Sequence, residues 1–499
     1  MDYSDYHTSY NELLSQVADD LSGSFAALSS PTLSKQETVT HLYKRVLSDN
    51  LEGGLWLDII LFPPKIFYSF LRMIFMFFLL GKITLPKGGI VFRSWLEPKC
   101  VNSDEVLDEH FRKLPDMISS SNNAISLLHP YDYKLIASYY KKKKGKNNKF
   151  ITISVLGFFQ IVKLHIDYAF TGLAKAQKQY FFRGKNITKF INRSLLIDFL
   201  RLRSFTAYQE KYTAKKIASF SPKSYVYVFE NQSWEKVACN VMRRAGVKVI
   251  GVQGSGFSPI FLNFLPTKLD AIMAARNQLS PDVIFTVGNS FTKMMKKNGC
   301  YAAPILSFGA LRFDYRKDKQ GYIIQQPIKK IYKKVLYAFP VHLSQYKEII
   351  KDLINVFGES DVVVDLKFHP QYKSVNLDLN LPSNFNIVGY VDQKTFRFTY
   401  DFVLFNDNSF GLESLILGVR SYQYAVNDFG IDDRFFYFNL WEKFIKKDDL
   451  AQLRLQLSNS SLDKNFDINE VRSFINSTYK SHYDLDLFKA WAFSDFAAL

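Results

Sequence analysis

Short apolar runs that do not alternate with polar residues constrain the fold of this chain more than any other feature. Tyr225–Phe229 (YVYVF) and Val283–Val287 (VIFTV) show the pattern. A strand has this composition when both of its faces are buried, as in a parallel sheet covered by helices. Helix-compatible stretches such as Trp234–Ala245 separate the runs, so the sequence predicts an α/β doubly wound fold. The predicted strands are Ile90–Trp95, Ala124–Leu128, Tyr225–Phe229, Lys248–Val252, Val283–Val287, Lys334–Phe339, Val362–Phe368, Phe402–Phe405 and Ser421–Ala425.

The predicted strands are too numerous for one sheet of typical size, so we expect two Rossmann-like domains. The polar stretch at 310–330 is the predicted break between them. The predicted parts are an N-terminal helical region with an apolar segment (1–87), a first Rossmann-like domain with a helical, basic insertion at about 150–220 (88–320), and a second Rossmann-like domain (321–499). No GxGxxG motif follows a predicted strand and the sequence has no P-loop motif, so dinucleotide and P-loop sites lose their main support.

The formal net charge of +17 is compatible with nucleic acid, an anionic lipid surface or an anionic substrate as a partner. The dense basic run Lys141–Lys149 (KKKKGKNNK) contains no aromatic residue, which favours a solvated loop over a nucleic-acid groove. Without a helix-turn-helix, zinc-finger or RNA-binding signature, no nucleic-acid partner is expected. The three cysteines are far apart, and the first residues do not resemble a signal peptide, so the sequence predicts a reducing, cytoplasmic setting.

One apolar segment, Ile66–Leu80, stands apart from the rest of the chain and is flanked by Lys65 and Lys82. It is shorter than the roughly 20 residues that a membrane-spanning helix needs. Pro63 and Pro64 are expected to stop the helix from extending towards the N-terminus. The segment therefore predicts a helix that lies in the membrane interface, with basic flanks facing anionic lipid. A buried core helix and a true membrane span are the alternatives.

Polar residues follow several predicted strands, where open α/β sheets bind their ligands. In the first half, FENQSWE places Glu230 at a strand tip, where a carboxylate can act as a general base or a nucleophile. The alternative is that Glu230 or Glu235 only favours the dipole of the following helix. Gln253 follows the next strand in a glycine-rich turn, and His129 follows an earlier strand as a candidate acceptor-side group. The predicted substrate-binding residues are Asn231, Gln232, Trp234, Glu235, Gln253 and His129.

In the second half, His369 directly follows a strand and is held by Pro370, which biases it towards an extended backbone. This position suits a phosphate contact or assistance to a leaving group. Another strand ends in Asn-Asp-Asn-Ser before a predicted helix, whose free N–H groups would favour a phosphate. A capped helix without a ligand is the alternative. The predicted nucleotide-binding residues are His369, Pro370, Asn408, Ser409, Glu413 and Ser414.

These motifs resemble those of known families. FRSWL (Phe92–Leu96), DEHFRKLPDMI (Asp108–Ile118), FENQSWEK (Phe229–Lys236) and GVQGSGFSP (Gly251–Pro259) resemble a group of bacterial surface carbohydrate biosynthesis proteins. The His-Pro pair and the later Asn/Ser-rich turn resemble the nucleotide site of GT-B sialyltransferases and capsule Kdo transferases. The sequence departs from the sialyltransferase pattern in reading Glu-Asn-Gln at the acid motif and in lacking consecutive hydroxyl residues at the phosphate turn.

The resemblance implies a GT-B glycosyltransferase at the cytoplasmic face of the inner membrane. It would move a 2-keto sugar acid, a sialic-type nonulosonate or Kdo, from a CMP donor to a surface polysaccharide or lipid-linked glycan. Glu230 and His369 would be the catalytic residues, with Asn408 and Ser409 holding the phosphate or the sugar carboxylate. No cofactor or metal is expected besides the donor, because no DxD pair follows a predicted strand. A CDP-polyol phosphotransferase and a non-catalytic glycan-assembly scaffold are the alternatives.

Overall fold

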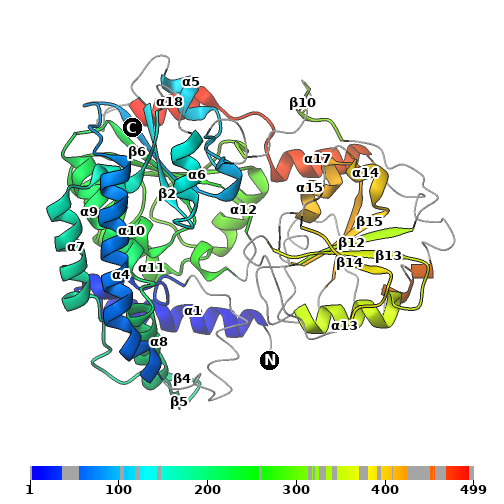
Figure 1. Ribbon diagram of the computed structural model, residues 1–499, viewed down its shortest axis with the longest axis horizontal. Coiled ribbons are helices and arrows are strands. Elements are labelled where there is room, and N and C mark those ends of the chain that lie inside the picture. The colour runs from blue at the N-terminus through cyan, green and yellow to red at the C-terminus, as the bar shows by residue number, and fades with distance from the viewer. Residues whose placement is uncertain are drawn as a thin grey trace.

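The chain folds around two parallel β-sheets that lie beside each other, each flanked by helices (Figure 1). The predicted α/β fold with two Rossmann-like domains is thereby confirmed. The computed structural model describes residues 3–35, 55–101, 106–119, 124–142, 148–254, 256–257, 261–312, 317–318, 321–324, 333–339, 346–369, 380–389, 391, 395–406, 408, 410–424, 450–452, 454–455 and 468–493.

The first sheet has seven strands in the order β3-β2-β1-β6-β7-β8-β9, all parallel. The first strand, β1, lies inside the sheet, and β2 and β3 follow it towards one edge. The chain then returns to the other side of β1, where β6 to β9 follow one another towards the opposite edge. The strand order therefore reverses between β1 and β6, and the crevice at such a point is where open sheets bind ligands. The strands are β1 (Ile90–Leu96), β2 (Ala124–Pro130), β3 (Lys149–Ile151), β6 (Ser224–Phe229), β7 (Lys248–Gln253), β8 (Val283–Thr286) and β9 (Ile305–Ser307).

The second sheet repeats this plan with five parallel strands in the order β14-β13-β12-β15-β16. Its order reverses between β12 and β15, so each sheet has one switch point. The strands are β12 (Lys334–Ala338), β13 (Val363–Lys367), β14 (Phe385–Ile387), β15 (Phe402–Phe405) and β16 (Arg420–Gln423). Two short antiparallel pairs lie outside the sheets, β4 (Phe181–Phe182) with β5 (Lys185–Asn186) and β10 (Lys317–Asp318) with β11 (Gly321–Tyr322).

Helices cover both faces of the sheets. The apolar run Tyr225–Phe229 in strand β6 follows from this, because its side chains are buried on both faces. Tyr225, Tyr227 and Phe229 belong to one core cluster, while Val226 and Val228 belong to another. The helices of the first part are α1 (Tyr3–Asp20), α2 (Phe25–Ser29), α4 (Trp56–Leu80), α5 (Leu114–Ser119), α6 (Leu135–Lys142), α7 (Phe158–Thr171), α8 (Thr188–Leu200), α9 (Phe205–Ala218), α10 (Ser233–Arg244), α11 (Lys268–Arg276) and α12 (Asn289–Asn298). The later helices are α13 (Tyr346–Phe357), α14 (Phe396–Thr399), α15 (Phe410–Ile416), α17 (Ile468–Thr478) and α18 (Leu485–Phe493), and short 3-10 turns span Pro98–Val101, Thr152–Val155 and Leu262–Phe264.

The last helix corrects the predicted extent of the second domain, 321–499. Helix α18 packs on the first sheet, where the ring of Phe488 stacks on that of Phe92 with centroids 6.0 Å apart. Phe488 also meets Phe285 and Phe308 in the same core cluster. The first sheet exposes an apolar face here that a local helix does not cover, so the end of the chain returns to bury it.

Helix α4 corrects the prediction that Pro63 and Pro64 would block a longer helix. It runs without interruption from Trp56 to Leu80 and contains both prolines. Each proline leaves one carbonyl without its helical N–H donor, those of Ile59 and Ile60. Both of these residues are exposed, so the freed carbonyls need no protein partner.

A buried arginine joins the centre of the first sheet to its helices. Arg93 on β1 is fully buried, and its Nε donates to Oε2 of Glu210 on α9 at 3.1 Å. Its guanidinium lies over the ring of Trp234 at 4.1 Å and over that of Trp95 at 4.6 Å. The hydroxyl of Tyr225 on β6 donates to the other carboxylate oxygen of Glu210 at 2.8 Å. The two strands at the switch point and two helices therefore meet at one ion pair.

We expect Glu210→Ala to lower the free energy of unfolding by about 3–5 kcal/mol, because it leaves the charge of Arg93 buried without its partner. Urea unfolding followed by circular dichroism measures the change. Asp361→Ala, which breaks the exposed Lys333–Asp361 pair, is the control and should change stability by less than about 1 kcal/mol. Equal losses in the two variants would contradict the role given to the buried pair.

Candidate active site between the two sheets

Two carboxylates lie at the switch point of the first sheet. Glu97 directly follows β1 and Glu230 directly follows β6, the two neighbouring strands between which the order reverses. Their charges interact, because Glu97 is among the groups that raise the pKa of Glu230. The carboxyl ends of β1 and β6 thus bring together two acidic groups that are far apart in the sequence.

The turn after β6 is built to hold Glu230 in place. Asn231 adopts a left-handed backbone with φ of 55°, a conformation that asparagine tolerates better than most residues. The carboxylate of Glu235, in the first turn of α10, accepts the N–H of Glu230 at 3.0 Å and that of Asn231 at 2.8 Å. Asn263 donates to the carbonyl of Glu230 at 2.5 Å, and Asn231 donates to the carbonyl of Asn263 at 2.7 Å. Glu235 therefore supports the turn and does not face a ligand.

The side chain of Glu230 is oriented by a short relay of polar groups. The amide of Gln232 donates to Oε2 of Glu230, and the indole N–H of Trp234 donates to Oε1 of Gln232 at 2.8 Å. Trp234 is itself fixed between Arg93 and the edge of Trp95, whose ring centroid is 5.5 Å away. The carboxylate at the strand tip is thus connected to the buried ion pair beneath it.

A histidine from a different part of the chain completes the first-sheet side of the site. Nε2 of His110 lies 3.0 Å from Oε1 of Glu97. Asp108 fixes the loop that carries this histidine, because its Oδ1 accepts the N–H of His110 and that of Phe111, each at 3.0 Å. Nδ1 of His110 is buried and has no hydrogen-bond partner within the described part of the chain. The sequence analysis missed both His110 and Glu97.

Arg312 adds a positive charge to this pair. Its Nη2 is 3.6 Å from Oε2 of Glu97. Burial opposes ionisation of Glu97, but the hydrogen bond and charge of His110, together with the charges of Arg312 and Lys99, outweigh it and lower the pKa of Glu97 to about 2. Glu97 is therefore an anion at neutral pH, held between two basic groups.

The pKa of Glu230 is shifted in the opposite direction. Burial raises the pKa of Glu230 and the negative charge of Glu97 raises it further, against the lowering effects of His110 and Arg312. One carboxyl of the site is thus kept ionised and the other is made a better proton acceptor. This division is typical of groups that carry out acid–base chemistry.

Gly254, which follows β7, lets His110 approach the sheet. A Cβ at this position would lie 2.8 Å from Nδ1 of His110 and 2.8 Å from Cγ1 of Val228. Both distances are shorter than real Cβ contacts allow. The glycine-rich turn after β7 therefore has a packing role at Gly254.

The second sheet has charged groups at its own strand ends that interact electrostatically with this cluster. Lys367 ends β13, and Glu413 lies in the first turn of α15. Burial and the charge of Lys99 lower the pKa of Lys367, against the opposing effect of Glu413. Glu413 also interacts with Arg312, which in turn interacts with Glu230. Charges from both switch points are therefore in electrostatic contact.

Several predicted site residues serve the fold. Gln253 is buried and its Oε1 accepts the N–H of Val287 at 3.2 Å, so it does not lie at the mouth of the site. Ser414 is fully buried and donates to the carbonyl of Phe410 at 2.7 Å, which argues against a nucleotide contact. Asn408 donates to the carbonyl of Ala338 at 2.9 Å and accepts the N–H of Phe410 at 3.0 Å, so its side chain joins β12 to α15.

Two predicted histidines differ in position. His129 is buried at the end of β2, where its Nδ1 lies 3.2 Å from the hydroxyl of Thr152 and its ring packs on the edge of Trp95. Burial and the charge of Arg93 hold its pKa well below the usual range, which indicates a neutral core residue. His369 is half-buried two residues beyond β13, on the same strand end as Lys367. Pro370 and Ser409 lie outside the described residues.

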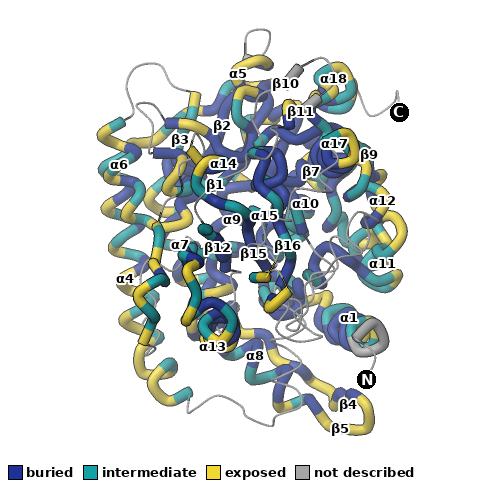
Figure 2. Tube along the Cα trace, turned by 90° about the vertical axis from the view of Figure 1, so that its right-hand side faces the viewer, coloured by how far each residue is buried: buried dark blue, intermediate teal, exposed yellow. Residues whose placement is uncertain are grey.

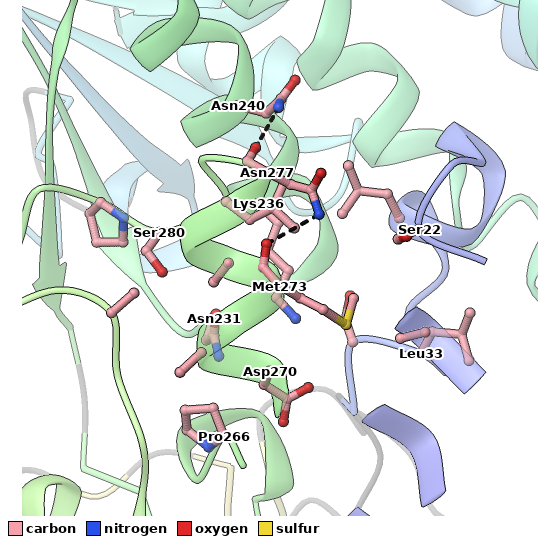
Figure 3. Close-up of a pocket in the computed structure, with 18 of the residues that line it drawn as sticks. Ser22, Leu33, Asn231, Lys236, Asn240, Pro266, Asp270, Met273, Asn277 and Ser280 are labelled. Carbon is pink, nitrogen blue, oxygen red and sulfur yellow. Dashed lines mark hydrogen bonds between the residues drawn. The ribbon is translucent and has the colours of Figure 1, made fainter. Parts of the chain in front are cut away.

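A cavity lined by both polar and apolar residues borders the turn at Asn231 from the side of the N-terminal segment (Figure 3). Its volume is about 270 Å³, and it lies between α10, α11 and residues 18–34. Asp270 on its wall pairs with Lys35, and burial lowers the pKa of this lysine to about 8 despite the pairing. The N-terminal segment is therefore anchored behind the turn that carries Glu230, and forms part of the first domain.

Comparisons with known proteins give only a distant structural similarity. No protein-family model matches the sequence, and no curated protein matches it. Similar solved structures include the calicheamicin glycosyltransferase CalG4 (9% identity, 81% of this chain and 98% of that chain, TM-score 0.43). A second is the glycosyltransferase SnogD from Streptomyces nogalater (11% identity, 81% of this chain and 99% of that chain, TM-score 0.43). A third is the UDP-GlcNAc 2-epimerase from Methanocaldococcus jannaschii (11% identity, 81% of this chain and 100% of that chain, TM-score 0.44). Likeness at this level assigns neither reaction to this chain.

We expect Gly254→Ala to lower the free energy of unfolding by about 1–3 kcal/mol, because the added methyl group has to displace His110 or Val228. The urea unfolding midpoint measures the loss. Gly389→Ala is the matched control, since a Cβ there meets nothing within 4 Å. A midpoint for Gly254→Ala equal to that of the control would show that His110 does not pack against this turn as described.

Proposed function

We propose that this protein is a glycosyltransferase that binds a nucleotide sugar between its two sheets. The observation that carries the proposal is that both switch points carry charged groups that influence one another's pKa, with Glu230 following β6 and Arg312 paired to Glu97 on one side, and Lys367 and Glu413 on the other. A transferase needs a base near the acceptor hydroxyl and positive charge near the leaving phosphate. The two sheets supply these groups separately, which a glycan-assembly scaffold would not require.

Glu230 is the proposed general base. The acceptor hydroxyl oxygen would form a bond to the anomeric carbon of the donor while its proton passes to the carboxylate of Glu230. The bond between that carbon and the phosphate oxygen would break, and the nucleotide would leave with the electron pair. The raised pKa of Glu230 favours proton acceptance, and the relay through Gln232 keeps the carboxylate oriented. In the alternative, Glu230 attacks the anomeric carbon itself and the configuration is retained.

His110 and Glu97 form the proposed positioning pair beside this base. Glu97 fixes Nε2 of the imidazole, and Nδ1 is buried against Gly254, so His110 acts by holding Glu97 and does not itself reach the substrate. Arg312 lies where it can balance negative charge that develops on the donor.

The donor proposed here is a CMP-activated 2-keto sugar acid, a sialic-type nonulosonate or Kdo. Such a donor carries a phosphate and a carboxylate, and the two switch points offer the cations Lys99, Arg312 and Lys367. His369 is proposed to contact the phosphate, since it shares a strand end with Lys367. Contacts from Pro370 and Ser409 are proposed on the sequence alone. Transfer is proposed to need no metal, and the acceptor is proposed to be a surface polysaccharide or lipid-linked glycan at the cytoplasmic face of the inner membrane.

The test is nucleotide release by the purified protein, offered a panel of CMP-sugar acids, CDP-polyols, UDP-sugars and dTDP-sugars with a glycan acceptor. We expect turnover of a CMP donor in the presence of a chelator, and a loss of about 10²-fold or more in Glu230→Gln. Asp116→Asn, an exposed carboxylate on α5, is the control and should keep full activity. Turnover of a CDP-polyol alone would support a polyol phosphotransferase, and release of no nucleotide would reject the transferase. The anomeric configuration of the product, read by NMR, separates the two roles of Glu230.

The pH dependence of kcat/KM offers a second test. If Glu230 is the base, activity falls as the pH drops through its raised pKa, because the protonated carboxyl cannot accept a proton. Glu97→Gln removes a negative charge that raises this pKa, so the acid limb should move to lower pH. Arg312→Gln removes a positive charge that lowers it, so the limb should move to higher pH. If the acid limb of the kcat/KM profile lies at the same pH in both variants as in the wild type, a group other than Glu230 controls the activity.

A further inference from the structure

Helix α4 presents a row of large apolar side chains to solvent. The row lies along one face, and most of the apolar side chains of the helix are not buried. Its most exposed large members are Trp56, Leu57, Ile60, Phe67, Tyr68, Phe75 and Phe78. Figure 2 shows the helix along one edge of the molecule with exposed residues over much of its length. Apolar surface of this extent on one element marks an interaction site.

Helix α7 lies against α4 and extends this surface. Phe159 and Phe170 are each 84% exposed, and Ile166 between them is 52% exposed. The spacing of these residues places them on one face of α7, while Leu164 and Tyr168 are buried on the other. The two helices are joined where the ring of Phe70 packs on that of His165 at 5.3 Å. The sequence segment Ile66–Leu80 gave no indication of this second helix.

The opposite face of α4 is fixed to the first domain. Met73 and Met76 are buried in the same cluster as Leu164 and Tyr168, and Phe62 packs on Phe199 of α8 with centroids 4.5 Å apart. A helix of 25 residues is long enough to cross a bilayer. With this face packed on a folded domain, however, α4 can only lie along a membrane.

The charges around the surface fit an anionic lipid layer. Arg72, the one charge within the apolar stretch Ile66–Leu80, lies over the ring of Tyr133 at 3.6 Å, so it packs sideways against the domain. Lys82 follows the end of α4, Lys175 follows the end of α7, and Lys163 lies among the exposed residues of α7; all three are exposed. Lysines at the edge of an apolar helical surface keep their ammonium groups at the level of lipid headgroups.

We propose that α4 and α7 together form a membrane-docking surface, which holds the first domain on an anionic lipid layer without spanning it. Trp56, Phe67, Phe75 and Phe78 of α4 and Phe159 and Phe170 of α7 enter the headgroup region, and the lysines contact lipid phosphates. The proposal is independent of the transferase activity, since none of these residues belongs to the charged cluster between the sheets.

The experiment is flotation of the full-length protein with vesicles of phosphatidylethanolamine and phosphatidylglycerol. We expect the wild-type protein to float with these vesicles and to bind phosphatidylcholine vesicles more weakly. The double variant Phe159→Ser/Phe170→Ser should bind about tenfold or more weakly, because two apolar side chains no longer leave water. Phe398→Ser is the matched control, since this phenylalanine is 54% exposed on α14 of the second domain and should not affect binding.

Three results would overturn the proposal. Unchanged binding of the α7 double variant, with an unchanged circular dichroism spectrum, would limit the contact to α4. Resistance of vesicle-bound protein to alkaline carbonate extraction would indicate a membrane span. Sedimentation as a stable dimer that the same double variant abolishes, without vesicle binding, would make a second copy of the chain the occupant.

Discussion

The buried guanidinium of Arg93 is the interaction on which the rest of the first domain depends. A charge fully removed from water is tolerated only with a partner, and Glu210 supplies it. The two tryptophans that enclose the guanidinium come from β1 and α10. The hydroxyl of Tyr225 on β6 donates a hydrogen bond to the second oxygen of the Glu210 carboxylate. The strands that define the switch point are thus held in register by a polar contact within an apolar core. Trp234, which packs on this guanidinium, donates a hydrogen bond to Gln232, and Gln232 in turn donates one to the carboxylate of Glu230.

The electrostatics of the candidate site follow from where the strands end. Parallel strands place the residues that follow them on one edge, so Glu97 and Glu230 meet although the sequence separates them widely. Their environments differ, because Glu97 has basic partners at close range whereas the carboxylate of Glu230 accepts a hydrogen bond from the neutral amide of Gln232. One carboxylate therefore stays charged and orients His110, while the other gains affinity for a proton. The second sheet brings its own charges to the same place through Lys367 and Glu413.

The fold could be predicted from the sequence to a large extent, because buried parallel strands have an unmistakable composition. Each predicted strand is present, and the missed edge strands β3, β9 and β14 have only three residues each. The continuity of α4 through two prolines and the return of α18 could not be predicted, since both depend on tertiary surroundings. Glu230 was found at its strand tip, and Glu97 could have been found by the same rule, because it directly follows β1. His110 lies in a loop and is placed by Asp108 and Gly254. The motif DEHFRKLPDMI contains it, but the sequence alone does not show that this histidine meets Glu97.

A crystal structure of the protein with CMP tests the central claim most directly, because it shows whether the nucleotide lies between the switch points. We expect the phosphate to face Lys367 and the space beyond it, where the sugar would lie, to open towards Glu230. A nucleotide bound elsewhere, for example in the cavity beside Lys236 and Asp270, would contradict it.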